Sequence, residues 1–102
     1  MMIKLLRLAG LARNAGKVEI GEAKILAAAR SGKARLLIIA SDVSPRTRKN
    51  AVILAEESNF GILSIECTKA ELGQSLGFAT CAIAAITDSG FAKAIKKAAS
   101  DA

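Results

Sequence analysis

Hydrophobic and polar positions along the chain follow two periods, one typical of helices and one typical of strands. The run Leu36–Ala40 is continuously apolar and too short for a helix, which predicts a central strand covered on both faces. The other predicted strands are residues 18–20, 62–66 and 82–86. The predicted helices are residues 3–14, 21–31 and 45–58, a fourth from 69 to about 77, and a last one that begins after Asp88.

Residue types at the predicted helix ends support these boundaries. Ser44 is a good N-cap and Pro45 fits a first turn. Thr68 and Glu71 have the spacing of a capping box, and Gly32 suits the position after a helix. Helices that alternate with strands in this way predict an α/β fold, a three-layer α/β/α sandwich, in one domain over residues 1–102.

The charge of the chain favours an anionic partner. Fifteen Lys and Arg against nine Asp and Glu give a net charge of +6, which points to nucleic acid, a membrane surface or an acidic protein. The whole excess lies in residues 1–35, so a face built from them would attract anions. An ordinary solvated surface would carry the same charges, and charge alone does not separate the two interpretations.

Missing residue types exclude several classes of function. The chain has no His, the usual general base at neutral pH, and no Trp or Tyr for an aromatic platform that stacks bases. Cys67 and Cys81, two cysteines in a small chain of ordinary core content, favour reduced, buried thiols over a single disulfide. They lack a neighbouring His and a CxxC spacing, which argues against a catalytic or redox role. No segment has the length of a membrane span or the layout of a secretory signal. We therefore expect a cytoplasmic protein with no catalysis, cofactor, metal or membrane contact.

Two polar features outside the basic third have competing explanations. Asp42 follows the predicted central strand, where it could hold a metal or cap a turn, and the cap is favoured because no second acid is near. Arg46, Arg48 and Lys49 occupy the first turns of a helix, where the macrodipole disfavours cations. Either an external anion or an acid elsewhere in the fold offsets that cost.

The segment that begins at Gly21 is the sharpest candidate site. A helix opens there directly after the basic loop Arg13–Lys17, and a helix N-terminus exposes unpaired amides to which phosphates or base edges can dock. We expect Lys17 and Lys24 to flank this site. A plain connecting helix with a few lysines is the alternative.

The spacing within this helix predicts which of its faces is exposed. Ile25 and Ala29 are placed to face the core. We expect Lys24, Ala27 and Ala28 to lie nearer the solvent.

Three stretches of sequence resemble one known family. GKVEIGEAKILAAARSGKARLLIIASDVSP resembles the signature segment of the kink-turn-binding ribosomal proteins, the L-seven-Ae / L-thirty-e group, and TKAELGQSLG resembles that family's distal-loop segment. LLRLAGLARNAGK is similar to the opening of its small bacterial, YlxQ-like branch. The resemblance spans nearly the whole chain. It implies a four-stranded mixed sheet and RNA binding without catalysis.

The resemblance also implies which residues contact RNA. One element is the start of the helix opened by Gly21, where the family motif reads G-x-N-E-x-x-K, and this chain has Ala23, Lys24 and Ala27 at the Asn, Glu and Lys positions. The other is the loop of Phe78, Ala79 and Thr80, although Phe78 could equally anchor the loop or belong to the core. The full predicted set is Arg13, Lys17, Gly21, Glu22, Ala23, Lys24, Ala27, Phe78, Ala79 and Thr80.

The sequence therefore predicts a translation-associated protein that binds structured RNA, either ribosomal RNA or another kink-turn-like RNA, with the ribosome as a further partner. The loss of three base-reading side chains favours RNA binding over kink-turn specificity. A module that keeps the fold, has lost specific RNA recognition and binds proteins is the alternative. The sequence leaves the oligomeric state open.

Overall fold

The computed structural model describes residues 2–100 and contains one mixed sheet. Its strands are β1 (Val18–Glu19), β2 (Leu36–Ile39), β3 (Gly61–Ser64) and β4 (Ile83–Ile86), in the order β1-β4-β2-β3. Strands β2 and β3 are parallel, and β4 is antiparallel to both β1 and β2. Strands β1, β2 and β3 therefore all run in one direction, and their carboxyl ends share one edge of the sheet.

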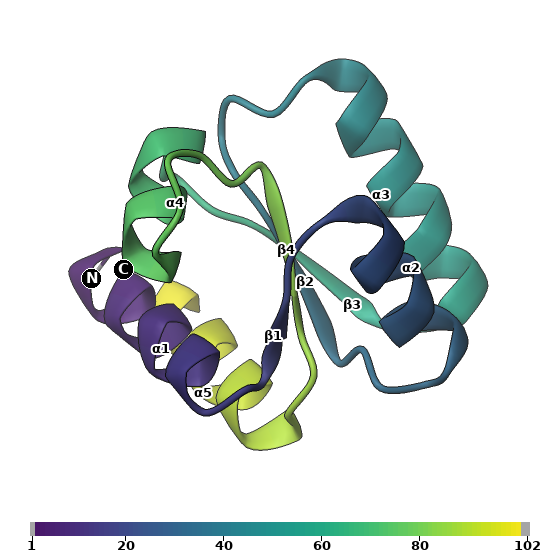
Figure 1. Ribbon diagram of the computed structural model, residues 1–102, viewed down its shortest axis with the longest axis horizontal. Coiled ribbons are helices and arrows are strands. Elements are labelled where there is room, and N and C mark those ends of the chain that lie inside the picture. The colour runs from purple at the N-terminus through teal and green to yellow at the C-terminus, as the bar shows by residue number, and fades with distance from the viewer. Residues whose placement is uncertain (1, 101–102) are drawn as a thin grey trace.

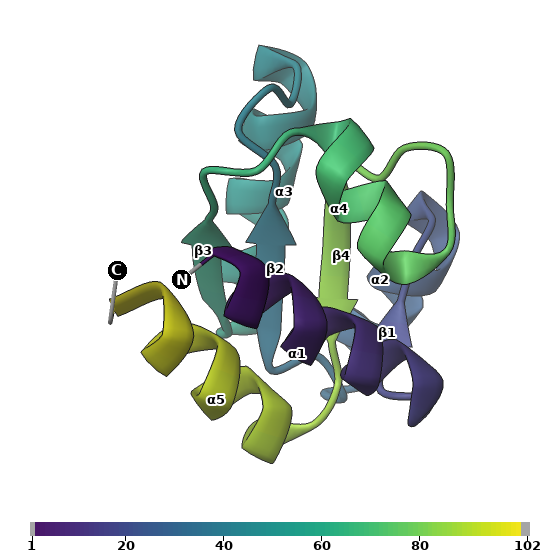
Figure 2. The same ribbon diagram turned by 90° about the vertical axis from the view of Figure 1, so that its left-hand side faces the viewer.

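Five helices cover the two faces of this sheet. They are α1 (Met2–Asn14), α2 (Glu22–Arg30), α3 (Pro45–Ser58), α4 (Lys69–Leu76) and α5 (Ser89–Ser100). Helices α1, α4 and α5 lie on one face and α2 and α3 on the other, with the sheet seen edge-on between them (Figure 1). Figure 2 shows the first layer from the front, with α1 and α5 side by side. The predicted three-layer α/β/α sandwich with a mixed sheet is confirmed.

Strand β2 explains why its sequence is apolar without alternation. Leu36 and Ile38 point into the core under α1, α4 and α5, whereas Leu37 and Ile39 point into the core under α2 and α3. All four side chains are fully buried. A strand between two helical layers needs apolar residues at every position.

The helix caps predicted from the sequence are present. The Ser44 hydroxyl accepts a hydrogen bond of 3.2 Å from the Thr47 amide. At α4 the Glu71 amide donates to the Thr68 hydroxyl at 3.2 Å, and the Thr68 amide donates to the Glu71 carboxylate at 2.9 Å. The Asp42 carboxylate accepts from the Lys69 amide at 2.7 Å, so Asp42 is a cap, on helix α4 rather than on its own turn.

Strand boundaries differ slightly from the prediction of residues 62–66 for the third strand. Strand β3 begins at Gly61, which pairs with Leu36, and ends at Ser64. One hydrogen bond follows it, from the Ile65 amide to the Ile39 carbonyl at 2.9 Å, and Glu66 is exposed beyond the ladder. Strand β3 ends where its partner β2 ends, and the hydrophobic pattern of the sequence does not indicate which strands pair.

The two cysteines are free, buried thiols, as predicted, and the alternative of a disulfide is wrong. Burial raises the pKa of Cys67, and the carboxylates of Glu71 and Glu66 raise it further. Burial also raises the pKa of Cys81, against smaller opposing effects from a hydrogen bond to Ile83 and the charge of Arg13. Both thiols therefore remain protonated at neutral pH.

Crossing a membrane requires a helix that is both long and apolar, and none of the helices within residues 2–100 meets that requirement.

Candidate functional site

The start of helix α2 is open to solvent. Gly21 has φ 99° and ψ 140°, a backbone conformation that favours glycine, and an added Cβ there would meet nothing within 4 Å. Within the described part of the chain no side chain caps this helix. Glu22, Ala23 and Lys24 are all exposed. The first-turn amides are therefore available to an external acceptor.

The buried side of α2 is wider than predicted. Ile25 and Ala29 face the core as expected, at 2% and 4% exposure. Ala28 is only 5% exposed, so the prediction that it lies near solvent is wrong. A helix packed between a sheet and a neighbouring helix buries a stripe at i, i+3 and i+4, which takes in Ala28. Lys24 and Ala27 are exposed, as predicted.

The loop between α4 and β4 brings two other predicted residues together. Gly77 ends helix α4 in the left-handed conformation at φ 84°, and Phe78 follows it with 40% of its surface exposed. The guanidinium carbon of Arg13, in the last turn of α1, lies 4.6 Å from the centroid of the Phe78 ring, within the range of a cation–π contact. Phe78 is therefore an exposed residue held by Arg13, and the interpretation as a core side chain is wrong.

Close packing on helix α4 fixes the position of this loop. Gly73 is buried, and a Cβ added to it would lie 2.7 Å from the Thr80 Cα and 2.8 Å from the Thr80 carbonyl carbon. Only glycine allows the backbone of the loop to come this near. The two glycines of the LGQSLG segment thus place the loop, Gly77 by its backbone angle and Gly73 by its lack of a side chain.

A groove of about 650 Å³ joins the two predicted elements. Helices α2 and α3 form its walls, and Gly21 and Glu22 lie on the same groove as Thr80. Further side chains along it are Ile25, Leu26, Arg46, Thr47, Asn50, Leu54, Glu57 and Ile83. The structure thus brings the start of α2 and the end of the loop to one surface.

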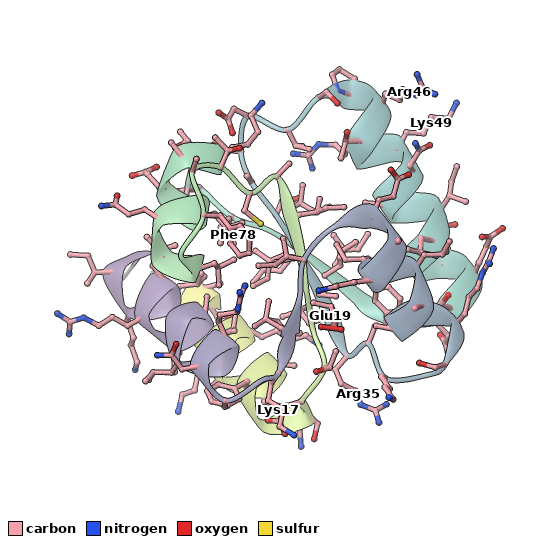
Figure 3. All side chains as sticks on the ribbon, in the orientation of Figure 1. Lys17, Glu19, Arg35, Arg46, Lys49 and Phe78 are labelled. Carbon is pink, nitrogen blue, oxygen red and sulfur yellow. The ribbon has the colours of Figure 1, made fainter. Side chains whose placement is uncertain are left out.

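Lys17 does not flank the start of α2, and that prediction is wrong. Extended chain through strand β1 separates Lys17 from Gly21, a span of about 13 Å. The Lys17 carbonyl accepts a hydrogen bond from Thr87 at 2.8 Å, and the Arg35 amide donates to Ile86 at 2.8 Å. Lys17 therefore lies beside Arg35 at the opposite end of the sheet (Figure 3). Whether it touches RNA stays a prediction.

The sequence analysis did not connect helix α3 with this site. Arg46, Thr47 and Asn50 line the groove across from Gly21, because parallel strands deliver the N-termini of α2 and α3 to the same edge. The signal in the sequence was the group of cations at the start of α3. Strand order, which decides what those cations face, is not visible in the sequence.

Together, the sheet, the two helical layers and this groove define a small α/β/α protein whose open helix start and adjoining loop share one surface. The chain matches the model of the ribosomal protein L7Ae/L30e/S12e/Gadd45 family over residues 4–96. It belongs to this family.

Two curated relatives are similar over most of their length, and both are called RNA-binding protein YlxQ. The one from Bacillus subtilis (strain 168) is 33% identical over 85 residues, which cover 83% of this chain and 84% of the relative. The one from Enterococcus faecium is 34% identical over 95 residues, covering 92% and 89%.

Two solved structures have the same fold. A protein with unknown function from Bacillus halodurans C has a TM-score of 0.85 at 24% identity, over 92% of this chain and 94% of that one. The Giardia lamblia 15.5kD RNA binding protein has a TM-score of 0.78 at 20% identity, over 98% and 85%. At these identities the likeness concerns the fold.

Proposed function

We propose that this protein binds structured RNA, without catalysis, through the start of helix α2 and the loop between α4 and β4. The observation that carries the proposal is the groove shared by Gly21, Glu22 and Thr80, which joins an uncapped helix start to the loop. The names of the two YlxQ relatives support the same function. The net charge of +6 suits a polyanionic partner.

The helix start would accept phosphates or base acceptor edges at its free amides, and Lys24 adds a cation in the first turn of the helix. Phe78 offers an exposed ring edge at the loop, with Arg13 stacked on its face. An unstacked base could pack on this apolar lip, while Ala79 and Thr80, both exposed, leave room beside it.

The RNA class we propose is a bent, kink-turn-like duplex, in ribosomal RNA or another RNA that acts in translation. The exposed positions of Ala23, Lys24 and Ala27 cannot reproduce the hydrogen bonds of the family's Asn, Glu and Lys. We therefore expect the preference for a kink-turn over a plain duplex to be weaker than in members with the intact motif.

The test compares two glycine variants that each place an alanine at a positive φ. Gly21 and Gly32 both have a positive φ, 99° and 76°, and an added Cβ at either meets nothing within 4 Å. Gly21→Ala and Gly32→Ala should each lose about 1–3 kcal/mol of stability. Only Gly21→Ala should weaken RNA binding, because only Gly21 sits at the open end of α2.

Fluorescence anisotropy with a labelled kink-turn RNA and with a plain duplex measures both affinities at one salt concentration. Equal losses in the two variants would show that the start of α2 is not the contact surface. Absence of RNA binding by the unchanged protein would reject the proposed function itself.

A protein-interaction module remains the second candidate, and helix α1 supplies the observation that favours it. Ile3 and Leu11 on this helix are 67% and 56% exposed, so α1 offers two large apolar side chains to a protein partner. Crosslinking in cells separates the candidates, since RNA binding predicts recovered RNA and the second candidate predicts recovered protein alone.

A further inference from the structure

The first two turns of helix α3 carry three cations whose surroundings differ. The Arg48 guanidinium donates a hydrogen bond of 2.9 Å to the Ser64 hydroxyl, which turns it toward strand β3. Arg46 and Lys49 are exposed, and both side chains extend away from the N-terminal end of α3 (Figure 3). Arg48 thus makes a contact within the protein, whereas the side chains of Arg46 and Lys49 point outward.

Nothing in the first turn of α3 offsets the two outward cations. That turn contains no acidic residue. Cations at a helix N-terminus are unfavourable because they face the positive end of the macrodipole. The amides there are not themselves a binding site, since the Ser44 hydroxyl accepts from Thr47. The candidate anion-binding groups at this helix start are therefore the side chains of Arg46 and Lys49.

The position of Arg46 connects this pair with the start of α2. Arg46 lines the groove opposite Gly21 and Glu22. Lys49 lies three residues after Arg46 and is therefore adjacent to Arg46 on the surface of helix α3. Thr47 and Asn50 line the same wall and offer polar groups beside the cations. Residues of the two helix starts thus line one groove at the same edge of the sheet.

We propose that Arg46 and Lys49 bind the phosphates of a second segment of the same RNA, so that the RNA crosses the groove from α2 to α3. The inference rests on the proposed function and extends it to a wall of the groove that the RNA-binding prediction did not include. RNA is favoured over an acidic peptide because the pair continues the surface formed by the start of α2.

The charge along the groove sets where the RNA crosses. Arg46 is at one end of α3, and Glu57 lines the groove about 16 Å further along the same helix. A phosphate backbone that followed the groove along its length would meet the carboxylates of both Glu22 and Glu57, whereas one that crosses near Arg46 passes Glu22 alone. The RNA therefore crosses at the edge where the parallel strands end.

The experiment measures affinity for a bent RNA duplex at several salt concentrations. Arg46→Ala combined with Lys49→Ala should weaken binding by roughly two- to fivefold for each residue. The slope of log affinity against log salt should become shallower by roughly 1.4–1.8 units for two lost phosphate contacts. Arg46→Lys combined with Lys49→Arg keeps both charges and should keep the slope.

The matched control removes the same charge from the other face of the sheet. Lys93→Ala combined with Lys97→Ala acts on helix α5, where both lysines are exposed, and should leave the slope nearly unchanged. Circular dichroism of each variant checks that the fold is intact.

Three outcomes would overturn the inference. An unchanged slope in the α3 variant, with RNA binding retained and still sensitive to Gly21→Ala, would reject it while leaving the proposed function in place; an acidic protein partner would then be favoured. Equal effects in the α3 and α5 variants would show that net charge alone is at work. No RNA binding by the unchanged protein would reject both.

Discussion

Lys24 shows what one side chain can contribute at a helix start. It is exposed in the first turn of α2, beside amides that no side chain caps within residues 2–100. A lysine there would raise affinity for phosphate without selecting a base, since a point charge reads no hydrogen-bond pattern. Its contribution should therefore appear in the salt dependence of binding.

We predict that Lys24→Ala weakens RNA binding by about 1 kcal/mol and lowers the salt slope by about one unit. Isothermal titration or anisotropy at four salt concentrations measures both quantities. Lys93→Ala on helix α5 is the control for loss of one charge. If Lys24→Ala left affinity and slope unaltered, the residue would have no role in binding.

At the scale of elements, the features that were predicted correctly are those determined by residues close together in the sequence. The caps at Ser44 and Thr68 and the buried strand β2 follow from neighbouring residues, and all were predicted correctly. The errors at Lys17 and Ala28 arose from tertiary structure. Strand β1 separates Lys17 from the start of α2, and packing of α2 between the sheet and a neighbouring helix buries Ala28.

The candidate site shows the same division. The start of α2 and the loop of Phe78 were proposed from resemblance, and their meeting on one groove was not visible in either segment alone. The contact between Arg13 and Phe78 joins residues far apart in sequence. Helix α3 was missed as a wall because only the strand order places it opposite α2.

Helix α2 also allows a gain-of-function test. Ala23, Lys24 and Ala27 are exposed, so larger polar side chains fit there without repacking the core. Ala23→Asn, Lys24→Glu and Ala27→Lys together restore the family motif. The combined variant should prefer a kink-turn over a plain duplex by at least tenfold more than the unchanged chain, at roughly 1–3 kcal/mol for each good bidentate contact.

A competition assay with labelled kink-turn RNA and unlabelled duplex measures that preference. Asn50→Ala, on the opposite wall of the groove, is the comparison variant, because it alters the groove and leaves the motif unchanged. No gain in preference would mean that the surroundings of α2, and not the three side chains alone, decide the specificity.

At the scale of the whole molecule, the two thiols report on the integrity of the core. Cys67 and Cys81 are 2% and 5% exposed, and burial raises the pKa of each. Fewer than about three thiols in a hundred are then ionised at pH 7, and the thiolate is the reactive form. Alkylation of the folded protein should therefore be slow.

Because the folded state holds both thiol protons more tightly than the unfolded chain, stability should be constant below the unfolded pKa and fall as pH rises past it. Labelling by iodoacetamide in urea should accelerate in step with the loss of helical circular dichroism. Ser89→Cys, at an exposed position on α5, supplies a thiol that reacts in the folded state. Rapid labelling of the unchanged chain in buffer would contradict a closed core.

The order of the strands has a consequence for how the molecule is made. Strand β1 hydrogen-bonds only to β4 among the described strands, and β4 is also the link between β1 and β2. During synthesis the chain up to the end of β3 therefore has no strand to which β1 can hydrogen-bond, and α2 lacks its contacts with β4. The surface that we assign to RNA would be completed only after Ile86, at the end of β4, has emerged from the ribosome.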